Sequence, residues 1–171
     1  MITLSWKTLH FSEKNHPAKT FTKVSAVALN DAGNMFNMPY ISTNTYESLT
    51  AAAVALVSWI ISVLKNYPND NIQIVPDYID TRFTEKVKKL LIENDCDDIT
   101  FVDRRELYRS LNFSKRKLVS FRRNLRQSIK KNRDLEAIYD RKDSFLIALE
   151  TIELQNILKS YQVKETLNDG F

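Results

Sequence analysis

Basic residues are concentrated in one segment of the chain, from residue 104 to residue 133. This segment holds twelve lysines and arginines and a single acid, Glu106. Three aromatic residues, Tyr108, Phe113 and Phe121, are interleaved with them. Lysine and arginine neutralise phosphates and release counterions, and aromatic rings stack on unpaired bases. The segment therefore predicts a surface that binds nucleic acid.

The candidate phosphate contacts in this segment are all lysines or arginines. They are Arg104, Arg105, Arg109, Lys115, Arg116, Lys117, Arg122, Arg123, Arg126, Lys130 and Lys131. The positive charge is local, because residues 1–103 hold nine basic and twelve acidic residues, and residues 134–171 hold four and eight. Self-repulsion within such a segment is costly unless a polyanion is near. An acidic protein, or the acidic C-terminal part of this chain, is the competing partner.

The other reactive residue types form no recognisable site. His10 and His16 stand six residues apart and make no metal-ligand pattern with the single cysteine, Cys96. The sequence has no nucleophilic triad, no glycine-rich phosphate loop and no zinc-ligand spacing. One cysteine excludes an intramolecular disulfide, and we expect a cytoplasmic protein.

An alanine-rich stretch carries a resemblance to a known family. Residues 43–56 read TNTYESLTAAAVAL. This stretch resembles the start of the first helix of the ribonuclease H family, where the pattern is TNNxxELxAAxxAL. The matching residues are Thr43, Asn44, Leu49, Ala51, Ala52, Ala55 and Leu56. Ser48 stands where that pattern has a metal-binding glutamate, and the nearest acid, Glu47, comes one residue earlier.

The resemblance implies a particular chemistry. Enzymes of that family cut the phosphodiester backbone with two divalent ions, which a set of carboxylates holds. These acids lie on the first strand, in the first helix, after the fourth strand and at the start of the last helix. Asp77 follows the apolar run Ile72–Val75, where the resemblance places the fourth-strand aspartate, so it is the candidate metal ligand. Asp80 and Glu47 are the further catalytic candidates, and the ion would be Mg²⁺ or Mn²⁺.

Departures from the family pattern indicate a degenerate site. The run Ile2–Phe11 contains no acid, and Trp6 and Lys7 stand where the first aspartate is expected. One residue of helix rotates a side chain by about 100°, so Glu47 does not replace the missing glutamate and is better explained by helix capping. The last-helix acid would have to be Asp140 or Asp143.

We therefore expect a nucleic-acid-binding protein that keeps the fold, has lost the two-metal site and needs no cofactor. It would hold a duplex or single strand by its backbone within a larger assembly. An active nuclease that uses Mg²⁺ or Mn²⁺ is the alternative. A module that docks an acidic protein partner is a further alternative. The small size and the lysine- and asparagine-rich composition suit a protein encoded by a mobile element or phage.

Hydrophobic periodicity predicts the elements that position these residues. The predicted order is β-β-β-α-β-α-β, which is the order of the ribonuclease H fold. Strands are expected at Ile2–Phe11, Phe21–Leu29, Met35–Ile41, Ile72–Val75 and Ile99–Val102. Helices are expected from an N-cap at Asn44 to Lys65, with Glu47 completing a capping box, and at Thr84–Asn94.

The C-terminal part is predicted to be helical. Ser114 can cap one helix, a longer helix begins near Asp134, and residues 164–171 are expected to be a frayed tail. With 171 residues, the chain divides into an α/β domain at 1–103 and a helical extension at 104–171. The uncharged run Ser48–Leu64 contains three serines and a threonine, so we expect it to pack on the sheet rather than to cross a membrane.

Overall fold

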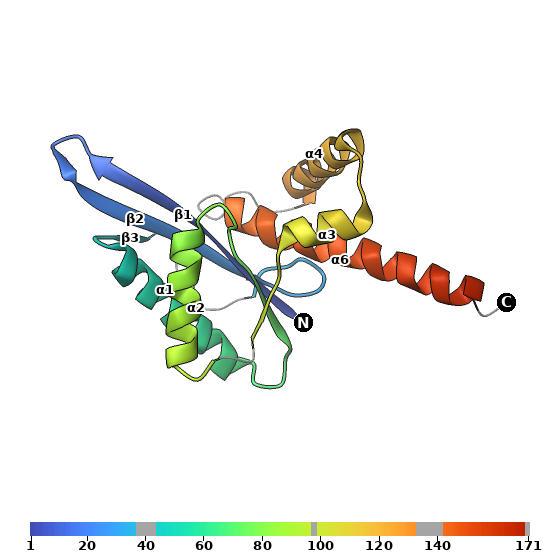
Figure 1. Ribbon diagram of the computed structural model, residues 1–171, viewed down its shortest axis with the longest axis horizontal. Coiled ribbons are helices and arrows are strands. Elements are labelled where there is room, and N and C mark those ends of the chain that lie inside the picture. Colours follow the sequence, from blue (N-terminus) through green and yellow to red (C-terminus); the bar gives the residue numbers. More distant parts are fainter. Residues whose placement is uncertain (37–43, 97–98, 133–141, 170–171) are drawn as a thin grey trace.

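The protein is an α/β structure with a mixed five-stranded sheet (Figure 1). The computed structural model describes residues 1–36, 44–96, 99–132 and 142–169. The strands are β1 (Ile2–Glu13), β2 (His16–Leu29), β3 (Asn44–Tyr46), β4 (Ile72–Val75) and β5 (Thr100–Phe101). The described helices are α1 (Leu49–Asn66), α2 (Thr81–Glu93), α3 (Arg104–Leu111), α4 (Lys115–Asn132) and α6 (Lys142–Asp169).

The sheet has the strand order β3-β2-β1-β4-β5. Strands β1, β2 and β3 form an antiparallel meander as predicted, but its third strand is Asn44–Tyr46, whereas the prediction placed it at Met35–Ile41. Strands β4 and β5 are parallel to β1. The β1–β4 register pairs Ile2 with Ile72 and Ser5 with Val75, so β4 lies beside only the first part of β1. The rest of β1 pairs with β2 alone in a long hairpin that projects from the body of the protein (Figure 1).

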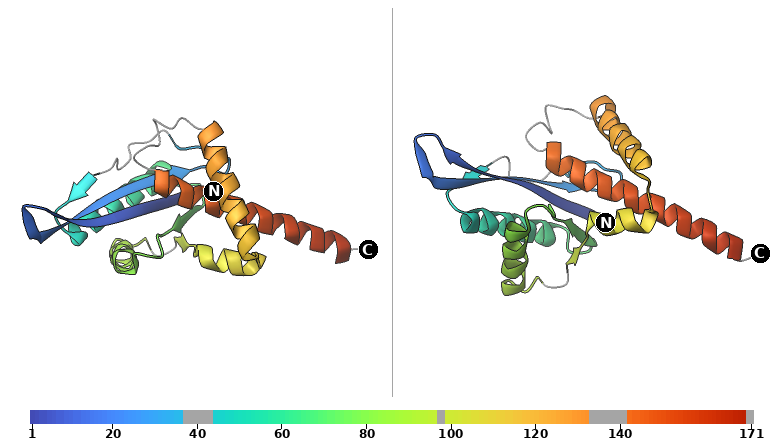
Figure 2. Two further views of the ribbon diagram at one scale, coloured as in Figure 1. Left: turned by 90° about the horizontal axis from the view of Figure 1, so that it is seen from above. Right: turned by 45° about the horizontal axis from the view of Figure 1, so that its top comes forward.

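Helices cover both faces of the sheet. The main core joins even-numbered residues of β1, such as Leu4 and Trp6, to buried residues of α1 and α2. A second core joins Val27 and Leu29 of β2 to α4 and α6. Because successive strand residues point to opposite faces, α1 and α2 lie on one side of the sheet and α4 and α6 on the other, as Figure 2 shows. Helices α4 and α6 therefore pack on the sheet.

Helix α1 begins later than the sequence predicted. Asn44 is not its N-cap, because this residue lies in β3 opposite Val24. The N-cap is Ser48, whose hydroxyl accepts a 3.0 Å hydrogen bond from the Ala51 N–H. The helix is long and apolar enough to cross a membrane by length and composition alone. Seven of its residues are nevertheless buried in this protein, which makes it a core helix as expected.

Other boundaries also differ from the predictions. Turn 30–34 is confirmed, since the Asn30 side chain accepts hydrogen bonds from two backbone N–H groups and Gly33 takes a φ of 79°. Met35 then makes only an isolated bridge to Leu29, and residues 37–41 of the predicted third strand lie outside the described part. Helix α6 continues to Asp169, so the expected fraying from residue 164 is wrong. The predicted helix start near Asp134 lies outside the described residues.

Candidate functional site

Asp77 is held by a lysine of the first strand. It follows β4, is 2% exposed, and its Oδ2 lies 2.9 Å from Nζ of Lys7. Its Oδ1 accepts a 3.2 Å hydrogen bond from the Ile79 N–H. Both oxygens of the candidate metal ligand therefore already have donors. The cation that contacts the Asp77 carboxylate is the ammonium group of Lys7.

The surroundings of this ion pair contain hydroxyls. Lys7 pairs across the sheet with Ser25, whose Oγ lies 2.9 Å from Oγ of Ser144. Ser144 belongs to the first turn of α6 and is fully buried, whereas its neighbour Asp143 is exposed. Asp143 therefore does not face the sheet as Ser144 does, and Asp140 lies outside the described residues.

Asp80 lies in the same turn as Asp77, and its backbone N–H donates a 3.2 Å hydrogen bond to the Asp77 carbonyl. Its Oδ2 accepts a hydrogen bond from the Thr8 hydroxyl and lies 2.7 Å from Nε2 of His10, and its Oδ1 caps α2 by accepting from the Phe83 N–H. Lys7 and Thr8 are consecutive strand residues and point to opposite faces, so the carboxylates of Asp77 and Asp80 contact opposite faces of β1. Burial raises the pKa of Asp80, but the hydrogen bonds from Thr8 and His10 outweigh burial and lower this pKa below its ordinary value.

Glu47 shares no side-chain partner with Asp77 or Asp80 among the described residues. Its side chain is 80% exposed and forms a loose ion pair, 3.7 Å long, with Lys19. Its expected capping-box role is wrong, because the cap is Ser48 and Glu47 precedes it. Within the part of the chain that the structure describes, no group of three or more histidine, cysteine, aspartate or glutamate side chains converges. The three sequence-predicted catalytic residues are thus not brought together.

A polar row that sequence reasoning missed lies between α6 and the sheet. The side chains of Gln73 on β4 and Gln155 on α6 exchange two 2.8 Å hydrogen bonds. Gln73 also donates to the Thr3 hydroxyl, at 2.9 Å. Together with Lys7 and Asp77, these groups make the α6 side of the central strands polar. In the sequence, this polar row could have been predicted from Gln73, which is a polar residue within an otherwise apolar strand.

Helix α4 separates its apolar and basic residues. Leu125 and Ile129 are buried against β2 and α6, and Phe121 packs beside them. The predicted cap is confirmed, since Ser114 Oγ accepts from the Lys117 N–H at 3.1 Å. The helix contains eight lysines and arginines and no acid. Six of its basic residues are exposed: Lys115, Arg116, Lys117, Arg123, Arg126 and Lys130.

Seven of the predicted basic residues are exposed and form no ion pair within 4 Å among the described residues. They are Arg109, Lys115, Arg116, Lys117, Arg123, Arg126 and Lys130. We refer to them as the basic face. Arg105 is exposed but is paired with Asp103 at 2.8 Å, and the side chain of Lys131 lies outside the described part. This arrangement leaves seven exposed positive charges on α3 and α4 without a salt bridge among the described residues.

Two predicted nucleic-acid contacts instead hold the helices together. Arg104 on α3 lies 2.9 Å from Glu150 on α6, and Arg122 on α4 lies 3.5 Å from the same carboxylate. Glu150 is 4% exposed, and this burial raises its pKa although Arg104 acts in the opposite direction. The signal for this cluster was an acid, Glu150, within the apolar stripe of the last helix. A buried acid of this kind needs basic partners.

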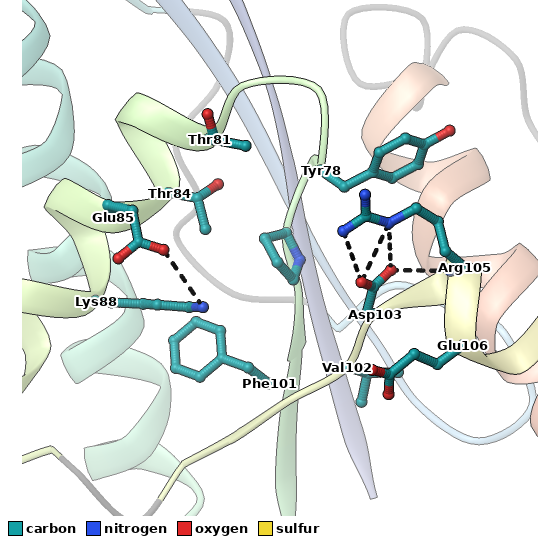
Figure 3. A pocket seen from close by; sticks show the side chains of 11 residues that line it. Tyr78, Thr81, Thr84, Glu85, Lys88, Phe101, Val102, Asp103, Arg105 and Glu106 are labelled. Atoms are coloured by element: carbon teal, nitrogen blue, oxygen red, sulfur yellow. Dashed lines mark hydrogen bonds and ion pairs between the residues drawn. The ribbon is translucent and has the colours of Figure 1, made fainter.

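A pocket with a volume of about 270 Å³ lies beside the carboxyl end of β4, between α2 and the start of α3 (Figure 3). Figure 3 shows Arg105 reaching under Tyr78 and facing Asp103, and Lys88 lying beside Glu85 and Phe101. The hydrogen bonds from Arg105 lower the pKa of Asp103. Because both cations are matched by acids inside the pocket, its charge is largely balanced. The basic face is the stronger candidate for an anionic ligand.

No family model, curated protein or solved structure matches this chain.

Proposed function

We propose that this protein binds nucleic acid through the basic face and keeps a ribonuclease H-like fold with a degenerate two-metal site. The observation that carries the proposal is the basic face itself. Seven exposed lysines and arginines, which form no salt bridge among the described residues, lie on α3 and α4. A polyanion with regularly spaced charges is the ligand that offsets their mutual repulsion best.

The strand arrangement supports the fold part of the proposal. An antiparallel meander is followed by alternating helices and strands, and the later strands are parallel to β1. The resemblance of residues 43–56 falls at the end of β3 and the start of α1, where that family carries the same pattern. The order β3-β2-β1-β4-β5 places β1 and β4 side by side, as the family's paired aspartates would require.

The residues around Asp77 support the degenerate site. Lys7 stands on the first strand where an acid would be needed, Ser48 caps α1 and is exposed, and Ser144 lies at the start of the last helix. An ammonium group 2.9 Å from Asp77 repels a divalent ion and neutralises the one acid left. Within the proposal, this region is structural, and binding uses the backbone phosphates.

The test compares two variants of equal charge. In the first, Lys115, Arg116, Arg123 and Arg126 are changed to glutamate. In the matched control, Lys14, Lys65, Arg82 and Lys89 are changed to glutamate; these four are also exposed and lie outside α3 and α4. Each variant carries a formal net charge of −4 in place of +4. Arg122 is left unchanged because it contacts Glu150.

Binding is measured by fluorescence anisotropy with labelled single-stranded DNA, duplex DNA, RNA and a DNA–RNA hybrid. We expect the first variant to lose at least roughly 100-fold in affinity, and the control to lose far less, because direct phosphate contacts dominate such binding. Equal losses in the two variants would contradict the proposal. Polyglutamate is measured in parallel. Binding of polyglutamate as tightly as an oligonucleotide of equal charge would favour the protein-docking alternative.

A further inference from the structure

A groove runs between α4 and the second half of α6. It has a volume of about 630 Å³, within the range of roughly 300–1,000 Å³ typical of ligand sites. Its lining includes Phe113, Lys117, Phe121, Asn124, Asn156 and Tyr161. Figure 2 shows α4 crossing α6 on the side of the sheet that also carries the second core. We name this feature the α4–α6 groove.

Aromatic rings form one wall of the groove. Phe113 and Phe121 meet edge to face with their centroids 5.8 Å apart. Phe113 is placed there by Asn112, which ends α3 in the left-handed conformation with a φ of 50° and turns the chain toward α4. Tyr161 of α6 is 39% exposed. Such rings are platforms on which bases of any sequence can stack.

Polar and charged groups surround these rings. Nζ of Lys117 lies 4.7 Å from the centre of the Phe113 ring, and Lys117 also belongs to the basic face. The Asn124 and Asn156 side chains are exposed and have no hydrogen-bond partner among the described residues. Amides supply both donors and acceptors for the edge of a base. The groove is thus lined by aromatic rings and lies against α4, which contains eight lysines and arginines and no acid.

We propose that the α4–α6 groove takes an unpaired base of a single-stranded nucleic acid whose phosphates lie on the basic face. This inference rests on the proposed function and specifies its substrate class. A base in a duplex is stacked and paired, so it cannot enter a groove lined by side chains without being unstacked. Lys117 lines the groove and belongs to the basic face, and the charge complementarity between this face and the phosphates of the strand favours nucleic acid as the occupant.

The test begins on the ligand side and needs no variant. A labelled fifteen-nucleotide single strand is compared with a strand of equal length in which abasic residues replace the central bases. Both strands have the same phosphates. We expect the intact strand to bind roughly 5- to 140-fold more tightly, the range that loss of one stacked base gives. A 2-aminopurine in the centre of the intact strand should lose fluorescence on binding.

Variants then place the effect in the groove. The double variant Phe113→Leu with Tyr161→Ala should bind the intact strand no more tightly than the abasic strand and should bind duplex DNA as the unchanged protein does. Tyr161→Phe keeps the ring and should behave as the unchanged protein does. Circular dichroism on heating checks that each variant is folded.

Three negative results are possible. Equal binding of intact and abasic strands by the unchanged protein would overturn the groove assignment and leave the proposed function standing. Absence of binding to every nucleic acid would remove both. Persistence of the base-dependent difference in a folded double variant would also overturn the groove assignment, because the stacked base would then lie elsewhere.

Discussion

The Lys7–Asp77 ion pair should stabilise the fold. The perturbation is a double-mutant cycle of Lys7→Met, Asp77→Asn and the combined variant. Removing Lys7 leaves a carboxylate whose side chain is only 3% exposed without its cation. Removing the charge of Asp77 leaves a lysine whose side chain is 34% exposed and still reaches water. The two single variants should therefore differ in cost.

The structure sets the size of each effect. At 2.9 Å and an effective dielectric constant of about 20, the direct attraction is about 6 kcal/mol before desolvation is subtracted. Breaking a buried pair by removing one partner costs about 3–5 kcal/mol, and the partial exposure of Lys7 reduces this. We expect Lys7→Met to cost about 2–4 kcal/mol and Asp77→Asn about 1–2 kcal/mol. The coupling energy should be about 1.5–3 kcal/mol.

The assay is urea unfolding at pH 7, followed by far-ultraviolet circular dichroism and tryptophan fluorescence. Trp6, next to Lys7, and Trp59 both lie in the main core, so their emission reports its loss. Lys23→Met on β2 is the control, because Lys23 is exposed and should cost less than about 0.5 kcal/mol. A coupling energy below about 0.5 kcal/mol would refute the reasoning that this pair stabilises the fold.

Three further outcomes are expected. Purified protein should cleave no single-stranded, duplex or hybrid substrate in Mg²⁺ or Mn²⁺; metal-dependent cleavage that disappears in Asp77→Asn would show an active nuclease instead. Because the folded-state pKa of Asp80 lies below its ordinary value of 3.8, its contribution to stability is present above that pH and is lost as the pH falls through the folded value. Asp80→Asn keeps a capping side chain and should flatten the acid limb of a stability–pH curve, and an unchanged limb would count against the Thr8 and His10 hydrogen bonds. Glu150→Ala should cost about 2–4 kcal/mol because Arg104 is left buried, whereas exposed Glu153→Ala should cost less than about 0.5 kcal/mol; equal costs in urea unfolding would disprove the helix-joining role.

The local patterns predicted most elements because they are encoded in short segments. Alternation in β1 and β2, the apolar run of β4 and the Ser114 cap are visible in neighbouring residues and occur in the structure. Boundaries were less predictable. The choice between Asn44 and Ser48 as the cap of α1 depends on whether Asn44 is needed in β3, and that pairing involves β2 far back in the sequence.

The partners of the charged residues could not be predicted in the same way. Lys7 and Asp77 are seventy residues apart, and their contact depends on the parallel register of β1 and β4. Arg104 and Arg122 contact Glu150 only because α3, α4 and α6 meet at this point. Sequence alone gave these arginines the same role as their exposed neighbours, since a charge run does not show which of its members face inward.

The salt dependence of binding tests the central claim most directly. The dissociation constant of the unchanged protein for a single strand and for a duplex is measured from 50 to 300 mM salt. If the seven residues of the basic face contact phosphates, the logarithm of the association constant falls with the logarithm of salt concentration with a slope of up to about −5 for a single strand and about −6 for a duplex. We expect a slope steeper than about −2 that becomes shallower by about one for each basic-face residue replaced by alanine. A slope near zero, or one that these replacements leave unchanged, would contradict binding through the basic face.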